Sequence, residues 1–219
     1  MPEFTKDNFL GGGIRIWQPK KGYRAGIDPI LLAASVNVSE GQKVLDLGCG
    51  VGTASFAIGY RVNNVERYGV EVQKSFVDLG NLNSKENGIE FKIECCNILS
   101  LSSNITSKSF DNLIANPPYF DRKSSVEGIN LSKEKSFGDT CPISEWLKVA
   151  AKRTKPKGFV HFIVRTDRLP EIFRNMPNSL GSLVITPVIS RKNENAKLTI
   201  LHAKTKGRGK IITKEQIIF

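Results

Sequence analysis

The segment from Lys43 to Val62 restricts the possible folds more than any other part of the chain. It begins with a short β-branched and leucine run (Lys43–Leu47), continues with glycines at positions 48, 50 and 52, and becomes helical in character from Thr53. This order indicates a strand, a tight glycine turn and a helix. Such a unit is typical of α/β proteins whose ligands bind beyond the carboxyl ends of the strands.

The rest of the chain repeats this alternation. Further strands are predicted at 67–71, 90–94, 110–115 and 158–164, with helices over 75–86 and from residue 142. A short helix at 169–174 precedes two more strands, within 183–189 and 198–203. The alternation predicts an α/β fold with a mostly parallel sheet and helices on both faces. We expect a main domain over 41–219, preceded by a basic segment with one short helix (1–40) that packs on this core.

The stretch 120–139 interrupts the pattern. It is rich in serine and lysine and shows no hydrophobic period. About twenty residues without secondary structure are uncommon inside a compact domain unless they bind something. We predict a mobile substrate loop here, with an insertion that has no role as the alternative.

Composition excludes several classes of protein. With 219 residues, 40% of them hydrophobic and 24% charged, the chain is large and apolar enough to fold. No apolar run approaches the roughly 18 to 20 residues of a membrane-spanning helix, and the first residues lack the apolar core of a secretory signal. We therefore expect a cytoplasmic protein without membrane association. Four cysteines and two histidines without ligand or disulfide spacing predict no metal site.

Polar side chains lie where three predicted strands end. Asp46 precedes the glycine turn, Glu71 closes the second strand and Asn97 follows the third. The carboxyl ends of parallel strands share one edge, so these groups should face one ligand. Glu71 is placed to accept hydrogen bonds from both ribose hydroxyls, while a carboxylate at position 46 would attract an ammonium group and repel a pyrophosphate. The sequence thus indicates a nucleoside with an amino-acid tail, such as S-adenosylmethionine, its methionine part against Gly48 and Gly50.

The segment Asn116-Pro117-Pro118-Tyr119 is the most specific signal in the chain. Prolines have a fixed φ and no N–H, so the Pro117 carbonyl and the Asn116 side-chain oxygen can be aimed rigidly as two acceptors. A planar NH₂ group has two matching donors, and holding both directs its nitrogen lone pair at a methyl donor. Tyr119 offers a ring face on which a base or amide can stack. The motif predicts methyl transfer to such a nitrogen; a Pro-Pro segment that merely ends a strand is the alternative.

The order and spacing of four motifs resemble those of the class I, Rossmann-like S-adenosylmethionine-dependent methyltransferases that methylate amino groups through an NPPY motif. The four motifs are DLGCGVG, GVE, CNI and NPPYF. The stretch Gln18–Ala34 is similar to the opening segment of the bacterial tRNA1(Val) adenine N6-methyltransferases, which modify the adenine beside the anticodon. The resemblance extends from about residue 18 to 208. It implies a seven-stranded sheet whose last strand is antiparallel.

The resemblance also implies the site residues. The catalytic motif would be Asn116, Pro117, Pro118 and Tyr119. The cofactor site would draw on the opening segment, the glycine turn and the strand ends: Lys21, Tyr23, Arg24, Asp46, Gly48, Cys49, Gly50, Glu71, Val72, Asn97, Ile98 and Asn116. Asn97 stands where many relatives have Asp, which keeps an acceptor for the adenine amino group and removes a charge.

Motif chemistry alone does not separate RNA from protein, because enzymes that methylate the glutamine amide of release factors share the motif. The net charge of +11 favours a polyanionic partner. Two basic clusters are candidates for phosphate contacts. One contains Arg15, Lys20, Lys21 and Arg24, and the other contains Lys197, Lys204, Lys206, Arg208 and Lys210. We predict a monomer that methylates adenine N6 in tRNA. The alternatives are a glutamine N5-methyltransferase, a non-catalytic RNA-binding relative and a nucleotide-dependent oxidoreductase.

Overall fold

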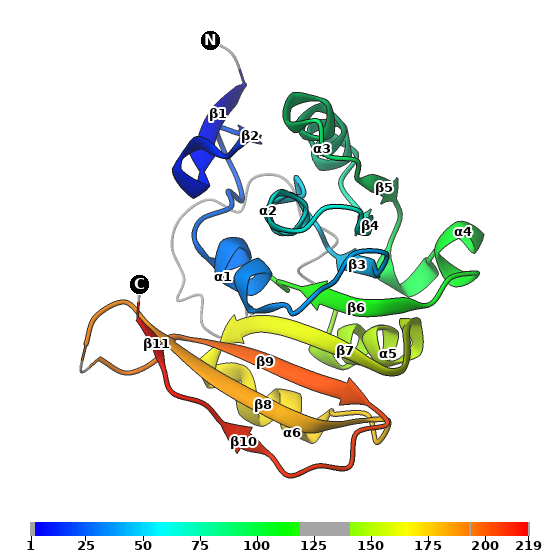
Figure 1. Cartoon of the computed structure of the whole chain (residues 1–219), viewed down its shortest axis with the longest axis vertical. Helices are drawn as coiled ribbons and strands as arrows, with labels where there is room; N and C mark the ends of the chain where they lie inside the picture. The colour runs from blue at the N-terminus through cyan, green and yellow to red at the C-terminus, as the bar shows by residue number, and fades with distance from the viewer. Residues whose placement is uncertain (1–2, 119–140, 193, 219) are drawn as a thin grey trace, which may run out of the picture.

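The computed structural model describes residues 3–118, 141–192 and 194–218, and one sheet runs through it (Figure 1). Its seven long strands lie in the order β5-β4-β3-β6-β7-β9-β8, parallel except for β9, which is antiparallel to both neighbours. They are β3 (Lys43–Leu47), β4 (Glu66–Glu71), β5 (Lys92–Cys95), β6 (Phe110–Ala115), β7 (Thr154–Arg165), β8 (Leu180–Ile189) and β9 (Leu198–Thr205). This confirms the predicted α/β fold and the antiparallel strand.

Two short strands widen the predicted sheet. β10 (Ile212–Thr213) and β11 (Ile217–Ile218) both pair in parallel with the outer side of β8. Each has only two residues, which is too short for a periodic pattern to appear in the sequence. The chain therefore returns along β8 after β9 has ended.

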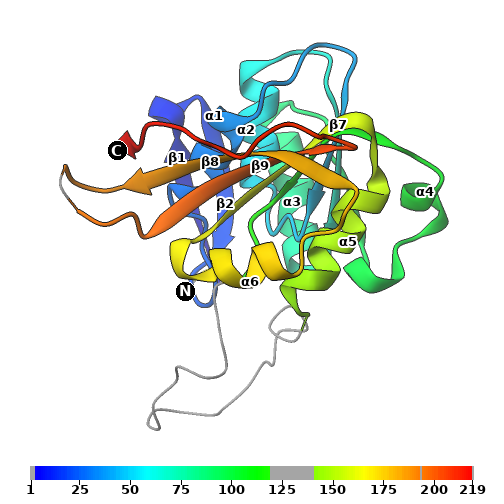
Figure 2. The ribbon, with the colours of Figure 1, turned by 90° about the horizontal axis from the view of Figure 1, so that it is seen from below.

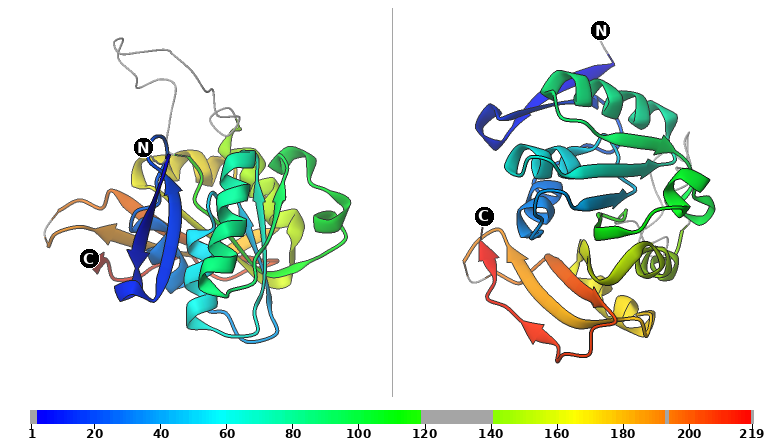
Figure 3. Two further views of the ribbon diagram at one scale, coloured as in Figure 1. Left: turned by 90° about the horizontal axis from the view of Figure 1, so that it is seen from above. Right: turned by 45° about the vertical axis from the view of Figure 1, so that its right-hand side comes forward.

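Helices cover both faces, as Figure 3 shows in its right-hand view. On one face lie α1 (Asp28–Ser35), α2 (Thr53–Arg61) and α3 (Lys74–Asn87), and on the other α4 (Ser103–Thr106), α5 (Ile143–Arg153) and α6 (Leu169–Arg174). Neighbouring strand residues point to opposite faces, so Val44 joins the first apolar cluster and Leu45 the second. Three short 3₁₀ helices complete the elements: η1 (Leu10–Gly12), η2 (Ile98–Ser100) and η4 (Thr166–Arg168). Among the helices described, none has the length and apolar character needed to cross a membrane.

Residues 4–19 form a β-hairpin that the sequence analysis did not predict. β1 (Phe4–Phe9) and β2 (Ile14–Pro19) pair antiparallel through η1. In β2 the side chains of Ile14 and Ile16 are fully buried while Arg15 is exposed, which is the period of a strand with one face on a core. The glycines at 11–13 and the neighbouring basic residues concealed this period. The hairpin and α1 share the apolar cluster of α2 and α3.

The side chains of two asparagines of α3 hydrogen-bond to the backbone along the unpaired edge of β2, as a neighbouring strand would. Asn83 is fully buried; its Oδ1 accepts from the Trp17 N–H (2.7 Å) and its Nδ2 donates to the Trp17 and Val51 carbonyls (3.2 and 3.1 Å). Asn87, at the exposed end of the helix, makes the equivalent pair with the backbone of Arg15 (2.8 and 2.7 Å). Asn83 therefore ties the hairpin to both α3 and the glycine turn.

Replacing Asn83 by alanine is expected to lower the free energy of unfolding by about 2 to 3 kcal/mol, because a buried N–H and two carbonyls lose their partners. Asn87→Ala, a matched change one turn away, should cost less than about 1 kcal/mol because water replaces the amide there. Urea unfolding of both variants measures the difference. Equal losses would show that Asn83 has no special role.

The strand directions define two edges of the sheet. The edge at which the parallel strands end, including β3, β4, β6 and β7, is called the carboxyl edge, and the opposite one the amino edge. Since β9 runs the other way, Arg165 pairs with Leu198 at the carboxyl edge and Phe159 with Lys204 near the amino edge. Figure 1 shows the β9 arrow pointing away from the end of β7.

Candidate functional site at the carboxyl edge

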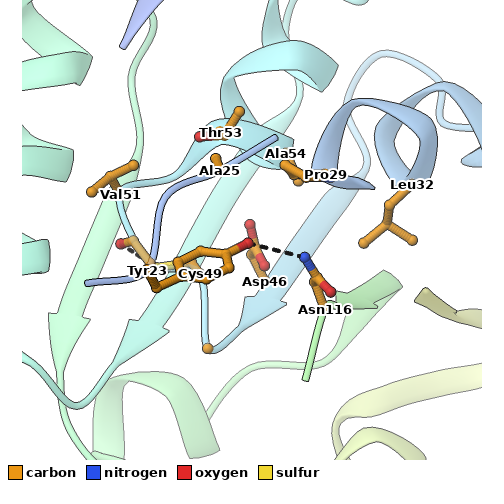
Figure 4. Close-up of a pocket in the computed structure, with 12 residues that line it drawn as sticks. Tyr23, Ala25, Pro29, Leu32, Asp46, Cys49, Val51, Thr53, Ala54 and Asn116 are labelled. Carbon is orange, nitrogen blue, oxygen red and sulfur yellow. Dashed lines mark hydrogen bonds between the residues drawn. The ribbon is translucent and has the colours of Figure 1, made fainter. Parts of the chain in front are cut away.

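A pocket opens at the carboxyl edge between the ends of β3 and β6 and the segment that precedes α1 (Figure 4). Its lining combines predicted site residues with residues of α1 and α2: Tyr23, Ala25, Pro29, Leu32, Asp46, Gly48, Cys49, Gly50, Val51, Thr53, Ala54 and Asn116. Residues almost a hundred positions apart in the sequence thus meet around one cavity. The strand order produces this meeting, because β3 lies directly beside β6.

The glycines of the turn have different functions. Gly48 and Gly50 have φ of +64° and +55°, in the left-handed region that favours glycine. A Cβ at Gly48 would lie 2.5 Å from the Trp146 ring, so this glycine is needed for the packing of α5. At Gly50 the nearest atom to a Cβ would be in the Tyr23 ring, at 4.0 Å. The Gly50 backbone is therefore the part of the turn open to a ligand in the pocket.

Asp46 is a buried carboxyl in the floor of the pocket, 3% exposed. Its Oδ2 accepts a hydrogen bond from the Ser55 hydroxyl of α2 (2.8 Å). Burial raises the pKa of Asp46 to about 7, the Ser55 hydrogen bond opposes this rise, and the nearby Glu71 adds to it. A cationic ligand would favour the ionised form, so the site is suited to an ammonium group.

Glu71, at the end of β4, connects the glycine turn to the neighbouring strand. Its two carboxylate oxygens accept from the backbone N–H groups of Gly50 (3.0 Å) and Gln73 (2.8 Å). Burial raises the pKa of Glu71, although these backbone donors oppose it. A carboxylate has about four acceptor positions, so two stay available for hydroxyl donors.

Asn116, directly after β6, presents an unused acceptor. Its Nδ2 donates to the Tyr23 hydroxyl (3.2 Å; Figure 4), while its Oδ1 is buried and has no hydrogen-bond partner among the described residues. The Thr53 hydroxyl oxygen, also in the pocket lining, is buried and unpartnered as well. Buried polar atoms without partners are costly, so two of them around one cavity indicate a polar ligand.

Tyr23 closes the pocket over the glycine turn. Burial of its hydroxyl, together with the carboxylates of Asp28 and Asp46, raises its pKa to about 12. The hydroxyl therefore stays protonated at neutral pH while it accepts from the Asn116 amide. One side chain thus links the glycine turn to the residue after β6.

Arg168 holds the other end of the motif, and sequence analysis did not identify it. Its guanidinium donates to the Pro118 carbonyl (3.2 Å) and, through Nε and Nη2, to Glu171 (3.2 and 3.1 Å). The contact joins segments fifty residues apart, which no local pattern could reveal. Thr53 was also missed, although a hydroxyl residue directly after the glycine turn was a usable signal.

Glu71 and the remaining predicted cofactor residues lie outside the pocket lining. Asn97 accepts from the Leu99 N–H (2.9 Å) and caps η2, and Ile98 is buried beside it, while Val72 follows Glu71 on β4. Arg24 forms an ion pair with Asp7 and hydrogen bonds with Thr5 and the Pro19 carbonyl, so it fastens the hairpin. Lys21 is exposed between β2 and α1. Tyr119 and the 120–139 loop lie outside the described residues.

The predicted phosphate-binding residues are divided between the two edges. Lys20 is exposed just after β2, on the side of the chain that leads into the pocket. Arg15 lies against the last turn of α3, where Glu86 pairs with it (3.6 Å). Lys204 lies near the end of β9 at the amino edge, and Lys206 and Arg208 follow that strand. The structure therefore does not bring these two clusters to one face.

Among residues 3–118, 141–192 and 194–218, no group of three or more histidine, cysteine, aspartate or glutamate side chains is arranged to bind a metal ion. The site itself offers hydrogen-bonding and charged groups. Those groups are the acceptors of Asn116 and Thr53, the carboxyls of Asp46 and Glu71, and the backbone of the glycine turn.

Comparison with known proteins agrees with this geometry. A family model described as a methyltransferase small domain matches residues 26–132, which include the glycine turn, the ends of β4 and β5 and the NPPY motif. The tRNA1(Val) (adenine(37)-N6)-methyltransferase of Haemophilus influenzae is 26% identical over 166 residues, covering 75% of this chain and 68% of that protein. The enzyme of the same name from Flavobacteriaceae bacterium strain 3519-10 is 25% identical over 138 residues, covering 62% of this chain. That match spans 58% of the relative's own length.

Solved structures share the fold at low identity. A predicted O-methyltransferase, Atu636 of Agrobacterium tumefaciens, superimposes with a TM-score of 0.70 at 20% identity, covering 87% of this chain and 86% of that one. A Thermus thermophilus 16S rRNA N2 G1207 methyltransferase, in complex with AdoMet and guanosine, gives 0.63 at 18% identity, covering 92% of this chain and 50% of the other. The sheet with its pocket at the carboxyl edge is thus that of Rossmann-like methyltransferases.

Proposed function

We propose that the chain is a class I S-adenosylmethionine-dependent methyltransferase and that it methylates the exocyclic N6 amino group of an adenine in tRNA. One observation carries the proposal: the buried, unpartnered Oδ1 of Asn116 in the wall of a pocket formed by the glycine turn. The names of its relatives support an adenine beside the anticodon of a valine tRNA. This nucleotide is the most specific part of the proposal.

The residues around the pocket fit S-adenosylmethionine. When bound, the cofactor supplies an electrophilic methyl group on a sulfonium. Asp46 would pair with its ammonium group directly or through water, and the open Gly50 backbone would lie along the methionine part. The free acceptor positions of Glu71 suit the two ribose hydroxyls, and Asn97 with the Ile98 N–H would contact the adenine.

The motif Asn116 to Tyr119 would hold the target amino group. The Asn116 side-chain oxygen and the Pro117 carbonyl would each accept one N–H hydrogen bond. The nitrogen lone pair would then be free to form the bond to the methyl carbon as the carbon–sulfur bond breaks and S-adenosylhomocysteine leaves. Positive charge develops on this nitrogen as the bond forms and strengthens both hydrogen bonds, so they stabilise the transition state more than the ground state. The methylated nitrogen is then acidic and loses its proton to water. We propose that Tyr119 stacks on the base and that the 120–139 loop orders around the RNA.

RNA is favoured over protein by the charge and by the names of the relatives. The net charge of +11 suits a polyanion, and the matched relatives are named as tRNA enzymes. A base held in structured RNA must leave its stack, which costs least for a nucleotide in a loop such as the anticodon loop. The alternative substrate is the glutamine amide of a release factor, which presents the same two donors. A non-catalytic RNA-binding relative would bind the cofactor without turnover.

Radiolabelled methyl transfer tests the proposal. The protein and labelled S-adenosylmethionine are incubated with unmodified tRNA and, separately, with release factor, and the labelled nucleotide is mapped with nucleases. We expect label in N6-methyladenosine of a tRNA. Label in release factor alone would replace RNA by protein as the substrate, and no label in either would favour the inert relative.

Arg168 is expected to act as a positioning residue, since it touches the motif without lying in the pocket lining. Arg168→Ala should lower kcat about tenfold, because the Pro118 carbonyl loses its anchor, while the affinity for S-adenosylhomocysteine stays within about twofold. Added guanidinium ion should restore part of the activity. The control is Arg174→Ala, an exposed change on α6 that should alter neither constant. A purely structural role would instead lower stability and kcat without rescue.

A further inference from the structure

We propose that RNA docks on the carboxyl edge through the β8–β9 loop, defined as residues 190–192 and 194–197, and not through the basic residues at the amino edge. This inference rests on the proposed function and identifies the surface that the RNA substrate would use. The sequence analysis grouped Lys197 with Lys204, Lys206, Arg208 and Lys210 as phosphate contacts. The structure separates Lys197 from the other four and favours it together with Arg191 and Lys192, for three reasons.

The first reason is that these three cations are available. Arg191, Lys192 and Lys197 are exposed, and the described part of the chain offers none of them an acidic partner. The arginines nearer the pocket are already occupied, since Arg165 pairs with Asp167 and Arg168 with Glu171. In the loop itself, the Glu194 carboxylate accepts from the Ser190 hydroxyl (3.1 Å). Unpaired cations retain their full attraction for phosphate.

The second reason is that the base of the loop is fixed to the catalytic motif. The Lys197 carbonyl accepts from the Thr166 N–H (2.9 Å), and the hydroxyls of Thr166 and Thr199 share a hydrogen bond (2.9 Å). Thr166 opens η4, and Arg168 at the end of η4 donates to the Pro118 carbonyl. The path of contacts from Lys197 to the motif therefore runs through the three residues of η4. RNA held by the loop would be held in a defined position relative to Asn116.

The third reason is distance along the sheet. β9 begins at the carboxyl edge beside Arg165 and ends beyond Lys204, and its eight residues span roughly 25 Å at about 3.3 Å each. Phosphates next to a base in the pocket lie at the carboxyl edge, so Lys206 and Arg208 are about one strand length away. The described parts of the β8–β9 loop, by contrast, join the end of β8 to the start of β9 at the carboxyl edge, and in Figure 2 they extend beyond the body of the protein.

Lys20 and Lys21 complete the surface on the other side of the pocket. Both are exposed between β2 and α1, and the segment leads directly to Tyr23. A strand of RNA that places one base against Asn116 could thus meet cations on both flanks. Backbone contacts of this kind position the nucleic acid and carry no sequence information, which fits a single-stranded loop selected by its shape.

Two variants of equal charge test the inference. The loop variant carries Arg191→Gln, Lys192→Gln and Lys197→Gln, and the control carries Lys206→Gln, Arg208→Gln and Lys210→Gln at exposed positions of the amino edge. Each lowers the net charge from +11 to +8. The Kd for an unmodified valine tRNA transcript is measured with S-adenosylhomocysteine present, over a range of salt concentrations. Titration of S-adenosylhomocysteine alone confirms that each variant retains its fold.

We expect the Kd of the loop variant for tRNA to rise about 30-fold near 0.1 M salt, with a slope of log Kd against log salt shallower by about 2 to 3. The control should change Kd less than about threefold. An equal or larger loss in the control, an unchanged Kd in the loop variant, or no tRNA binding by the wild type would each overturn the inference. If tRNA binds through the loop but no N6-methyladenosine forms, the surface stands and the proposed function fails.

Discussion

Asn116→Ala is expected to reduce the rate of methyl transfer by about 100- to 1,000-fold, the loss typical when one donor or acceptor that stabilises developing charge is removed. The Oδ1 of Asn116 is buried and has no partner within the described structure, so its acceptor capacity is available to the target amino group. Alanine at this position leaves one acceptor, the Pro117 carbonyl, which cannot fix the nitrogen lone pair alone. Single-turnover measurements at saturating tRNA report the chemical step directly.

Cofactor binding provides the control for this variant. The ammonium partner Asp46 and the ribose partner Glu71 do not change, so the Kd for S-adenosylhomocysteine should stay within about threefold. Tyr23→Phe is the matched milder change, because it removes the hydroxyl to which the Asn116 amide donates and retains the ring over Gly50. It should slow transfer by about three- to tenfold, since the amide can then rotate. Methyl transfer at the wild-type rate in Asn116→Ala would contradict the proposed role of the Asn116 side chain.

The part of the fold nearest the pocket could be predicted because its signals are local. The glycine turn follows a strand of five residues, and Asp46, Glu71 and Asn116 each stand where a strand ends, so one topological rule places them together. The hairpin of β1 and β2 escaped prediction because its core-facing isoleucines alternate with arginine and tryptophan next to three glycines. The conformation of this segment depends on its tertiary contacts with α3.

Contacts between distant segments could not be read from the sequence. Arg168 reaches Pro118 across fifty residues, and the Tyr23 hydroxyl reaches Asn116 across more than ninety. The separation of the basic clusters depends on the direction of β9, since the same lysines would lie at the carboxyl edge if β9 were parallel to β7. Charge in a sequence thus indicates the class of partner, while strand direction determines which face can meet it.

The affinity for S-adenosylmethionine is expected to rise with pH up to about 7, because the ammonium group pairs with the ionised form of Asp46 and the pKa of this carboxyl is raised to about 7. Below that pH the carboxyl is neutral, so log affinity should increase by about 1 per pH unit and binding should release a proton. Above about pH 8 the cofactor's own amino group begins to lose its proton, and affinity should fall again. Calorimetric titration between pH 5.5 and 9 in buffers of different ionisation enthalpy, at about half-unit steps, measures both the constant and the proton release.

Asp46→Asn should weaken binding about 30- to 100-fold at pH 7.5, which is the range expected for a lost charge-assisted hydrogen bond. It should also abolish the rise of affinity with pH below about 7, which is called the acid limb here. Loss of the fold cannot explain such a result: the folded pKa of Asp46 lies above the unfolded one, so ionisation destabilises the protein as pH rises through 4 to 7, and Asn removes this cost. Ser55→Ala is the informative companion, because the Ser55 hydroxyl opposes the pKa rise. Without it the limb should move to higher pH and persist. A limb that survives in Asp46→Asn would assign the titration to another group, with Glu71 the nearest buried carboxyl.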